Sequence, residues 1–156
     1  MRFHIVIVGR DRKDPLVLAA DAYLERVERS FGIEVTELKE SPARPSIPVE
    51  RTKKEEAAKI LSALSKDDYV IAFDERGRSL VSKEIAERVG RLASEGRSSV
   101  GLVIGGPNGL DPSVLERAHE TWSLSRLTLP HRLARLVMSE QLYRACSILR
   151  GEPYHK

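Results

Sequence analysis

The 156-residue sequence contains a single cysteine, Cys146, and no long apolar run. One cysteine can form no disulfide within the chain and cannot supply a zinc cluster, so a reducing cytoplasm is the simplest location. The N-terminal run FHIVIV is too short for the apolar part of a secretory signal. Nothing approaches the roughly 20 apolar residues of a membrane helix. We therefore expect a cytoplasmic protein of one domain, residues 1–156, without a membrane segment.

Several familiar site motifs are also missing. The sequence has no GxxxxGK[ST] and no GxGxxG after its first apolar run, which weakens a P-loop or dinucleotide site. It has neither HExxH nor a Cys/His cluster, so we predict no metal. Without a GxSxG elbow, no serine is presented as a hydrolase nucleophile. Among the candidate functions, a generic nucleotide-binding α/β hydrolase is therefore the least supported.

Positive charge is concentrated in the C-terminal segment. From Leu124 to Lys156 there are six basic and two acidic side chains, an excess of four, whereas the whole chain carries only +3. Such a local excess favours a polyanionic partner such as nucleic acid. A solvated basic helix face would show the same excess, and charge alone does not separate the two interpretations.

Apolar runs and helical spacings alternate along the chain, which predicts an α/β fold with a parallel-rich sheet and helices on both faces. The expected strands are 3–8, 33–38, 69–73 and 100–104. The expected helices are 16–29, 49–64, one from Ser82, 112–119 with Asp111 as N-cap, and 132–149. Two segments, SPARPSIP at 41–48 and DERGRS at 74–79, are predicted to be loops.

The stretch LVIGGPNGL, residues 102–110, places a glycine-rich loop directly after the most apolar predicted strand. Glycines permit positive φ angles and let a ligand approach the backbone. In open α/β sheets, small ligands bind at the carboxyl ends of the strands. The loop therefore indicates a binding site, although many glycine-rich loops merely turn the chain.

The last predicted helix is apolar on two sides. One stripe contains Met138, Leu142, Ala145 and Leu149, and Leu133, Val137 and Ile148 lie on another side. A helix of this kind is usually buried on both sides. We expect one side to face a second subunit; burial within a single core is the alternative.

Three segments carry a family resemblance: LVIGGPNGL, WSLSRLTLPHRLARLVMSEQLYRA and the terminal RGEPYHK. Together they closely resemble the bacterial large-subunit ribosomal RNA pseudouridine N3-methyltransferases, which belong to the SPOUT superfamily. The resemblance implies a homodimer, a C-terminal trefoil knot, and S-adenosylmethionine as cofactor. It further implies methylation of N3 of a pseudouridine in a stem-loop of 23S RNA on the assembled ribosome. Knots are rare exceptions among folds.

The resemblance also implies the cofactor site. Its residues would be Phe73, Gly105, Leu124, Ser125, Arg126, Leu127, Thr128 and Leu129. Physically, the three leucines can sandwich an adenine ring while backbone groups read its edge, and Gly105 and Gly106 leave room for the rest of the cofactor. The residues alone favour a different prediction, in which LSRLTL is an edge strand with its leucines in the core.

N3 of pseudouridine is protonated near neutral pH, so a base or a cationic group that stabilises the imide anion is expected. The candidates are His131, Arg144, Tyr154 and His155. We favour Arg144 and His155 for positioning RNA or stabilising the anion. Phosphate contacts are expected from Arg132, Arg135, Arg144 and Lys156. Each assignment has an alternative. His131 could simply form a local hydrogen bond, and Tyr154 and His155 could belong to a frayed terminus.

Two further functions fit the same motifs. One is a ribosome-binding protein that keeps the knot but has lost turnover. The other is a SPOUT methyltransferase that acts on transfer RNA. The intact cofactor segments favour an enzyme over the silent binding protein.

Overall fold

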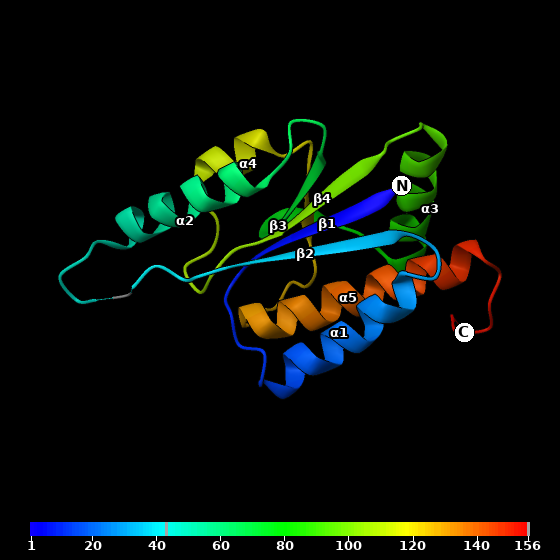
Figure 1. The fold of residues 1–156 in the computed structure, drawn as a ribbon, viewed down its shortest axis with the longest axis horizontal. Coiled ribbons are helices and arrows are strands. Elements are labelled where there is room, and N and C mark those ends of the chain that lie inside the picture. The colour runs from blue at the N-terminus through cyan, green and yellow to red at the C-terminus, as the bar shows by residue number, and fades with distance from the viewer. Residues whose placement is uncertain (43, 156) are drawn as a thin grey trace.

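A computed structural model describes residues 1–42 and 44–155 (Figure 1). Five parallel strands form one sheet in the order β2-β1-β4-β3-β5. The strands are β1 (Arg2–Val8), β2 (Gly32–Leu38), β3 (Tyr69–Ser79), β4 (Ser99–Ile104) and β5 (Glu120–Ser123). This confirms the predicted α/β class and parallel sheet.

Five helices cover the two faces of the sheet, as Figure 1 shows. They are α1 (Pro15–Val27), α2 (Val49–Ala63), α3 (Ser82–Ser94), α4 (Pro112–Arg117) and α5 (His131–Leu149). The side chains of β1 explain the layers, because neighbours along a strand point to opposite faces. Phe3, Ile5 and Ile7 pack with α1, α3 and α5. Val6 and Val8 pack with α2 and α4 on the other face.

Two expectations about the strands were wrong. DERGRS, predicted as a loop, belongs to β3, and β5 was not predicted. The strand signal was hidden because β3 is irregular there: Phe73 and Arg78 both pair with Trp122, so the residues between them form a bulge. Gly77 lies in this bulge, and a Cβ on it would be 2.6 Å from the backbone carbon of Trp122. Only glycine fits so close a crossing of two backbones.

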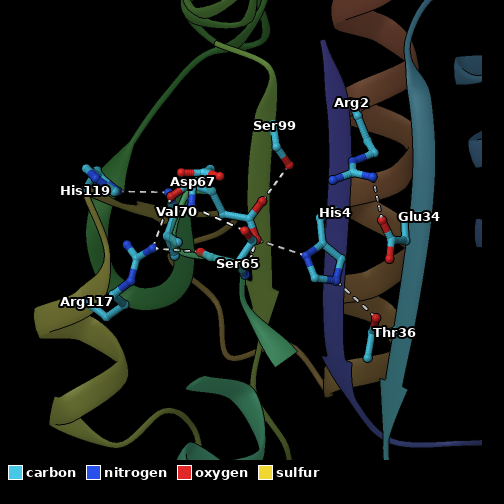
Figure 2. A network of polar contacts seen from close by, with 11 residues as sticks. Arg2, His4, Glu34, Thr36, Ser65, Asp67, Val70, Ser99, Arg117 and His119 are labelled. Atoms are coloured by element: carbon cyan, nitrogen blue, oxygen red, sulfur yellow. Dashed lines mark hydrogen bonds and ion pairs between the residues drawn. The ribbon is translucent and has the colours of Figure 1, made fainter. Parts of the chain in front are cut away.

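At the end of the sheet away from the β3 bulge, a buried polar network links neighbouring strands (Figure 2). His4 of β1 contacts Asp68 through Nδ1 at 3.0 Å and Thr36 of β2 through Nε2 at 3.1 Å. Ser99 of β4 donates to the second Asp68 oxygen at 2.5 Å. Burial alone would raise the pKa of Asp68, but hydrogen bonds from Ser99, His4 and the Ser65 N–H together lower it. The network joins the neighbouring strands β2, β1 and β4 to the residue just before β3, and it is a structural feature distant from the glycine loop.

In the part of the chain that the structure describes, no helix is both long and apolar enough to span a membrane. Within those same residues, no three His, Cys, Asp or Glu side chains are grouped so that they could hold a metal ion.

Candidate cofactor cleft

A cleft of about 760 Å³ opens at the carboxyl ends of β4 and β5, beside the bulge of β3. Most of the predicted cofactor residues line it: Phe73, Gly105, Gly106, Leu124, Ser125, Leu127, Thr128 and Leu129. These residues come from three separate segments, so the fold brings together what the sequence keeps apart. Arg126 is exposed and is not among the lining residues, although both of its neighbours are.

The glycine loop forms one wall of the cleft and needs its glycines for different reasons. Gly109 has a φ of 77°, the left-handed conformation that disfavours other residues. Gly105 and Gly106 do not have positive φ; they are required by close packing. A Cβ on Gly105 would be 2.9 Å from Leu110 Cδ2, and one on Gly106 would be 2.9 Å from Glu56 Oε2. The loop is thus tightly held from behind while its front faces the cleft.

The segment LSRLTL forms the opposite wall and is not a strand. The edge-strand alternative is wrong, since Leu127 has 75% of its surface exposed. Two serines hold the segment in a turn: Ser123 Oγ donates to the Ser125 carbonyl, and Ser125 Oγ accepts the Leu127 N–H, both at 2.9 Å. An exposed leucine beside a cleft is what a wall for a flat apolar ring requires.

Charged residues that the sequence did not single out also line the cleft. Lys53 comes from α2, and Asp74, Glu75 and Arg76 come from the β3 bulge. Arg76 donates to both oxygens of Asp74, at 2.9 and 3.2 Å, and chiefly through these bonds lowers the pKa of that carboxyl. The sequence did contain a signal for three of these residues, because the charged segment DERGRS directly follows the predicted strand 69–73.

His131 lies at the junction of the cleft and α5. It is the first residue of the helix, is half-buried, and lines the cleft. Its Nε2 is 3.3 Å from Glu40 Oε1. A hypothetical Cβ on Gly9 would be 3.1 Å from the same nitrogen, so the end of β1 also restricts the ring. His131 is the one catalytic candidate that lies beside the cleft of its own chain.

The other three catalytic candidates form a cluster at the far end of α5. Glu140 Oε1 accepts from Arg144 Nη2 at 2.5 Å and from the Tyr154 hydroxyl at 3.1 Å. Arg144 Nη1 lies 3.5 Å from His155 Nδ1. The pKa of Tyr154 is raised by its hydrogen bond with Tyr23, by burial and by Glu140, so the phenol stays protonated and acts as a donor.

This cluster does not reach the cleft of the same chain. Arg144 is thirteen residues after His131 on one straight helix, and at 1.5 Å per residue this places it about 20 Å away. Figure 1 shows α5 running from the cleft end of the sheet toward the C-terminus. The tail is packed rather than frayed, because the Tyr154 ring makes an edge contact with Tyr143 at 4.8 Å.

The expected phosphate contact by Arg135 is wrong. This side chain is 3% exposed and forms 2.7 Å ion pairs with Asp21 and Glu37. Arg132 is more accessible but is shared between Asp11 and Asp14. Lys156 lies outside the described residues. Two of the basic side chains of this segment, Arg132 and Arg135, are therefore paired with acidic residues from earlier in the chain, which a count along the sequence cannot reveal.

The fold and the cleft define a class: an α/β protein with a cleft between glycine and leucine loops at the carboxyl edge of a parallel sheet. The chain belongs to the SPOUT methyltransferase family, whose model, described as "Predicted SPOUT methyltransferase", matches residues 1–155. It is accordingly a methyltransferase.

Similar proteins agree over the full length. A protein of Anaeromyxobacter sp. (strain Fw109-5) is 50% identical, and the match covers 100% of both chains. One of Rubrobacter xylanophilus is 47% identical over 99% of this chain and 98% of its own. Both are named ribosomal RNA large subunit methyltransferase H. A probable methylase family protein of Haemophilus influenzae Rd KW20 has the same fold, with a TM-score of 0.55 at 16% identity over 99% of this chain and 70% of that one.

Proposed function

We propose that this protein transfers a methyl group from S-adenosylmethionine to N3 of a pseudouridine in a stem-loop of 23S ribosomal RNA, on the assembled ribosome. The observation that carries the proposal is the cleft, in which eight of the nine predicted cofactor residues meet. The names of its full-length relatives support large-subunit RNA as the substrate.

The residues fit the cofactor. An adenine ring needs apolar walls and backbone polar groups at its edge, and Leu124, Leu127 and Leu129 lie in a non-helical segment that can offer both. Gly105 and Gly106 line the same cleft, where the ribose and methionine portions would lie. Their lack of a Cβ lets the loop pack closely against Leu110 and Glu56 behind it. When bound, S-adenosylmethionine would supply an activated methyl group on a sulfonium.

The protein's own part in the reaction is alignment and charge. Holding N3 in line with the methyl carbon and the sulfur is an entropic contribution that needs fixed walls. His131, which contacts Glu40 at the start of α5, is the residue to which we assign the N3 proton. Arg144, Tyr154 and His155 would stabilise the imide anion or hold the RNA, with Arg144 as the permanent cation.

A homodimer would bring the two sets of residues together. Along α5, Arg144 lies about 15 Å beyond Ala134, the last residue of this helix that lines the cleft. We therefore propose that the tail cluster acts at the cleft of a second copy. Half-buried apolar residues on α3 and α5, among them Ile85 and Val137, line a groove of about 320 Å³ beside the exposed Val81. We assign this groove to the dimer. We also propose the C-terminal trefoil knot, which the family resemblance implies.

Labelled methyl transfer tests the proposed function. Ribosomes lacking this modification, incubated with the protein and methyl-labelled cofactor, should acquire one label in 23S RNA, and mapping should place it on a pseudouridine. Transfer to transfer RNA instead would establish the alternative substrate. Cofactor binding without transfer to either RNA would identify a silent ribosome-binding protein and contradict the proposal.

Salt dependence tests the RNA contact. Arg126, exposed at the rim of the cleft, makes no ion pair with any residue in 1–42 or 44–155, so it is free to meet a phosphate. Binding to ribosomes should weaken steeply with salt, and Arg126→Ala should reduce the slope of log K against log salt by about one. Arg2→Ala, at the opposite end of the sheet, is the control and should leave the slope unchanged. A flat salt response of the unmodified protein would exclude phosphate recognition.

A further inference from the structure

A buried carboxylate lies directly behind the glycine wall of the cleft. Glu56, on α2, is 4% exposed. Its Oε1 accepts the Ser41 N–H at 3.0 Å, which ties α2 to the segment after β2. Its Oε2 is buried and accepts no hydrogen bond within the described part of the chain. Because a Cβ on Gly106 would be 2.9 Å from Oε2, this unpaired oxygen faces the glycine turn.

The charge of Glu56 is not neutralised by its neighbours on α2. Lys59, one turn later, donates to the Lys39 carbonyl at 2.9 Å and to Ser41 Oγ at 3.1 Å. Lys53, one turn earlier, points instead to the cleft, which it lines. Across residues 1–42 and 44–155, Glu56 forms no ion pair. A buried carboxylate without a partner destabilises a folded chain, so its presence beside a ligand cleft needs a reason.

The other carboxylates near the cleft do not share this property. Asp74 is already bonded by Arg76 through both oxygens. Glu75 is exposed, and solvent screens its charge. Glu40 contacts His131, and Asp111 accepts the Ser113 N–H at the start of α4. Among these carboxylates, Glu56 is the one that is buried directly behind Gly106. Since water is excluded there, its field extends further than that of a surface carboxylate.

We propose that Glu56 determines the charge specificity of the cleft: it favours the cationic sulfonium of S-adenosylmethionine over the neutral thioether of S-adenosylhomocysteine. The inference rests on the proposed function, because it requires that cofactor in this cleft. The two ligands differ by one methyl group and one positive charge at sulfur. A fixed negative charge behind Gly106 attracts the substrate form more strongly and helps the product form leave.

Binding of the two ligands to Glu56→Gln tests the proposal. The amide keeps the shape of the side chain and an oxygen that can accept the Ser41 N–H. It removes the charge and replaces the second oxygen by an NH2 group. Calorimetric titration should show the affinity for S-adenosylmethionine about tenfold weaker, with that for S-adenosylhomocysteine changed less than twofold. The melting temperature of the ligand-free variant should be equal or higher, since an unpaired buried charge is gone.

Glu55→Gln is the matched control, because Glu55 is the adjacent residue of α2, is partly exposed, and pairs with Arg51. It should alter neither affinity. If Glu56→Gln weakens the affinities for both ligands equally, Glu56 only shapes the turn and the inference is overturned. The inference is also overturned if neither affinity changes. If Glu56→Gln folds poorly, Glu56→Asp must preserve the wild-type ratio of the two affinities, and loss of that ratio overturns the inference. Failure of the wild-type protein to bind either ligand would refute the proposed function itself.

Discussion

Gly77→Ala is expected to lower the free energy of unfolding by about 3 kcal/mol, at the upper end of what overpacking costs. The new Cβ would lie 2.6 Å from the Trp122 carbonyl carbon and 2.8 Å from the carbonyl carbon and oxygen of Thr121. All three are backbone atoms of β5, which cannot rotate away as a side chain can. Equilibrium denaturation in urea measures the loss.

Gly32→Ala provides the control for this substitution. A Cβ there would meet only Arg2, at an ordinary 3.6 Å, so stability should change by less than about 0.5 kcal/mol. If Gly77→Ala were as stable as Gly32→Ala, the two backbones could not cross as closely as the structure shows.

Arg135→Ala is expected to destabilise the protein by about 3–5 kcal/mol, because it leaves two carboxylates without the cation they share. The guanidinium is 3% exposed and joins α5 to Asp21 of α1 and Glu37 of β2. Arg132→Ala is the control: its side chain is 41% exposed, so a loss of at most about 1 kcal/mol is expected. Equal losses of stability in the two variants would contradict the buried ion pairs of Arg135. If Arg135→Ala instead lost ribosome binding without losing stability, the phosphate contact predicted for Arg135 would be restored.

The same bridge predicts a dependence on pH. Burial by itself would raise the pKa of Glu37, but Arg135 and Arg12 together bring it below its ordinary value of 4.5. A lowered pKa in the folded state gives stability that is complete above pH 4.5 and is lost as the pH falls through the folded value. The difference in stability between wild type and Arg135→Ala should therefore narrow on acidification below pH 4.5. A difference that stays constant down to pH 2 would contradict this assignment.

The sequence allowed the repeating strands and helices to be predicted, because their signals are local. The continuous apolar, β-branched run in Phe3–Val8 is such a signal, and so are the cap and proline at Asp111 and Pro112; each acts within a few residues. β5 could not be predicted in this way. It is only four residues long, and its pairing depends on a bulge in β3 more than forty residues earlier.

The candidate site was predicted in part for the same reason. The glycine loop is a local signal, and LSRLTL was interpreted as a site only through a family resemblance; its residues alone favoured a strand. Charge counted along the sequence was the least reliable indicator of the site residues. Arg135 counts as positive along the chain but is paired with residues about one hundred positions away. Glu56 gave no signal, since one glutamate on a polar helix looks solvated until the fold places it against Gly106.

Calorimetric titration of the purified, folded protein with S-adenosylmethionine tests the central claim most directly. The account predicts saturable binding of one cofactor per chain, and a Leu127→Asp substitution in the exposed cleft wall should weaken it. Absence of any heat of binding, together with a crystal structure in which Leu124, Leu127 and Leu129 are packed away from the cleft, would contradict it.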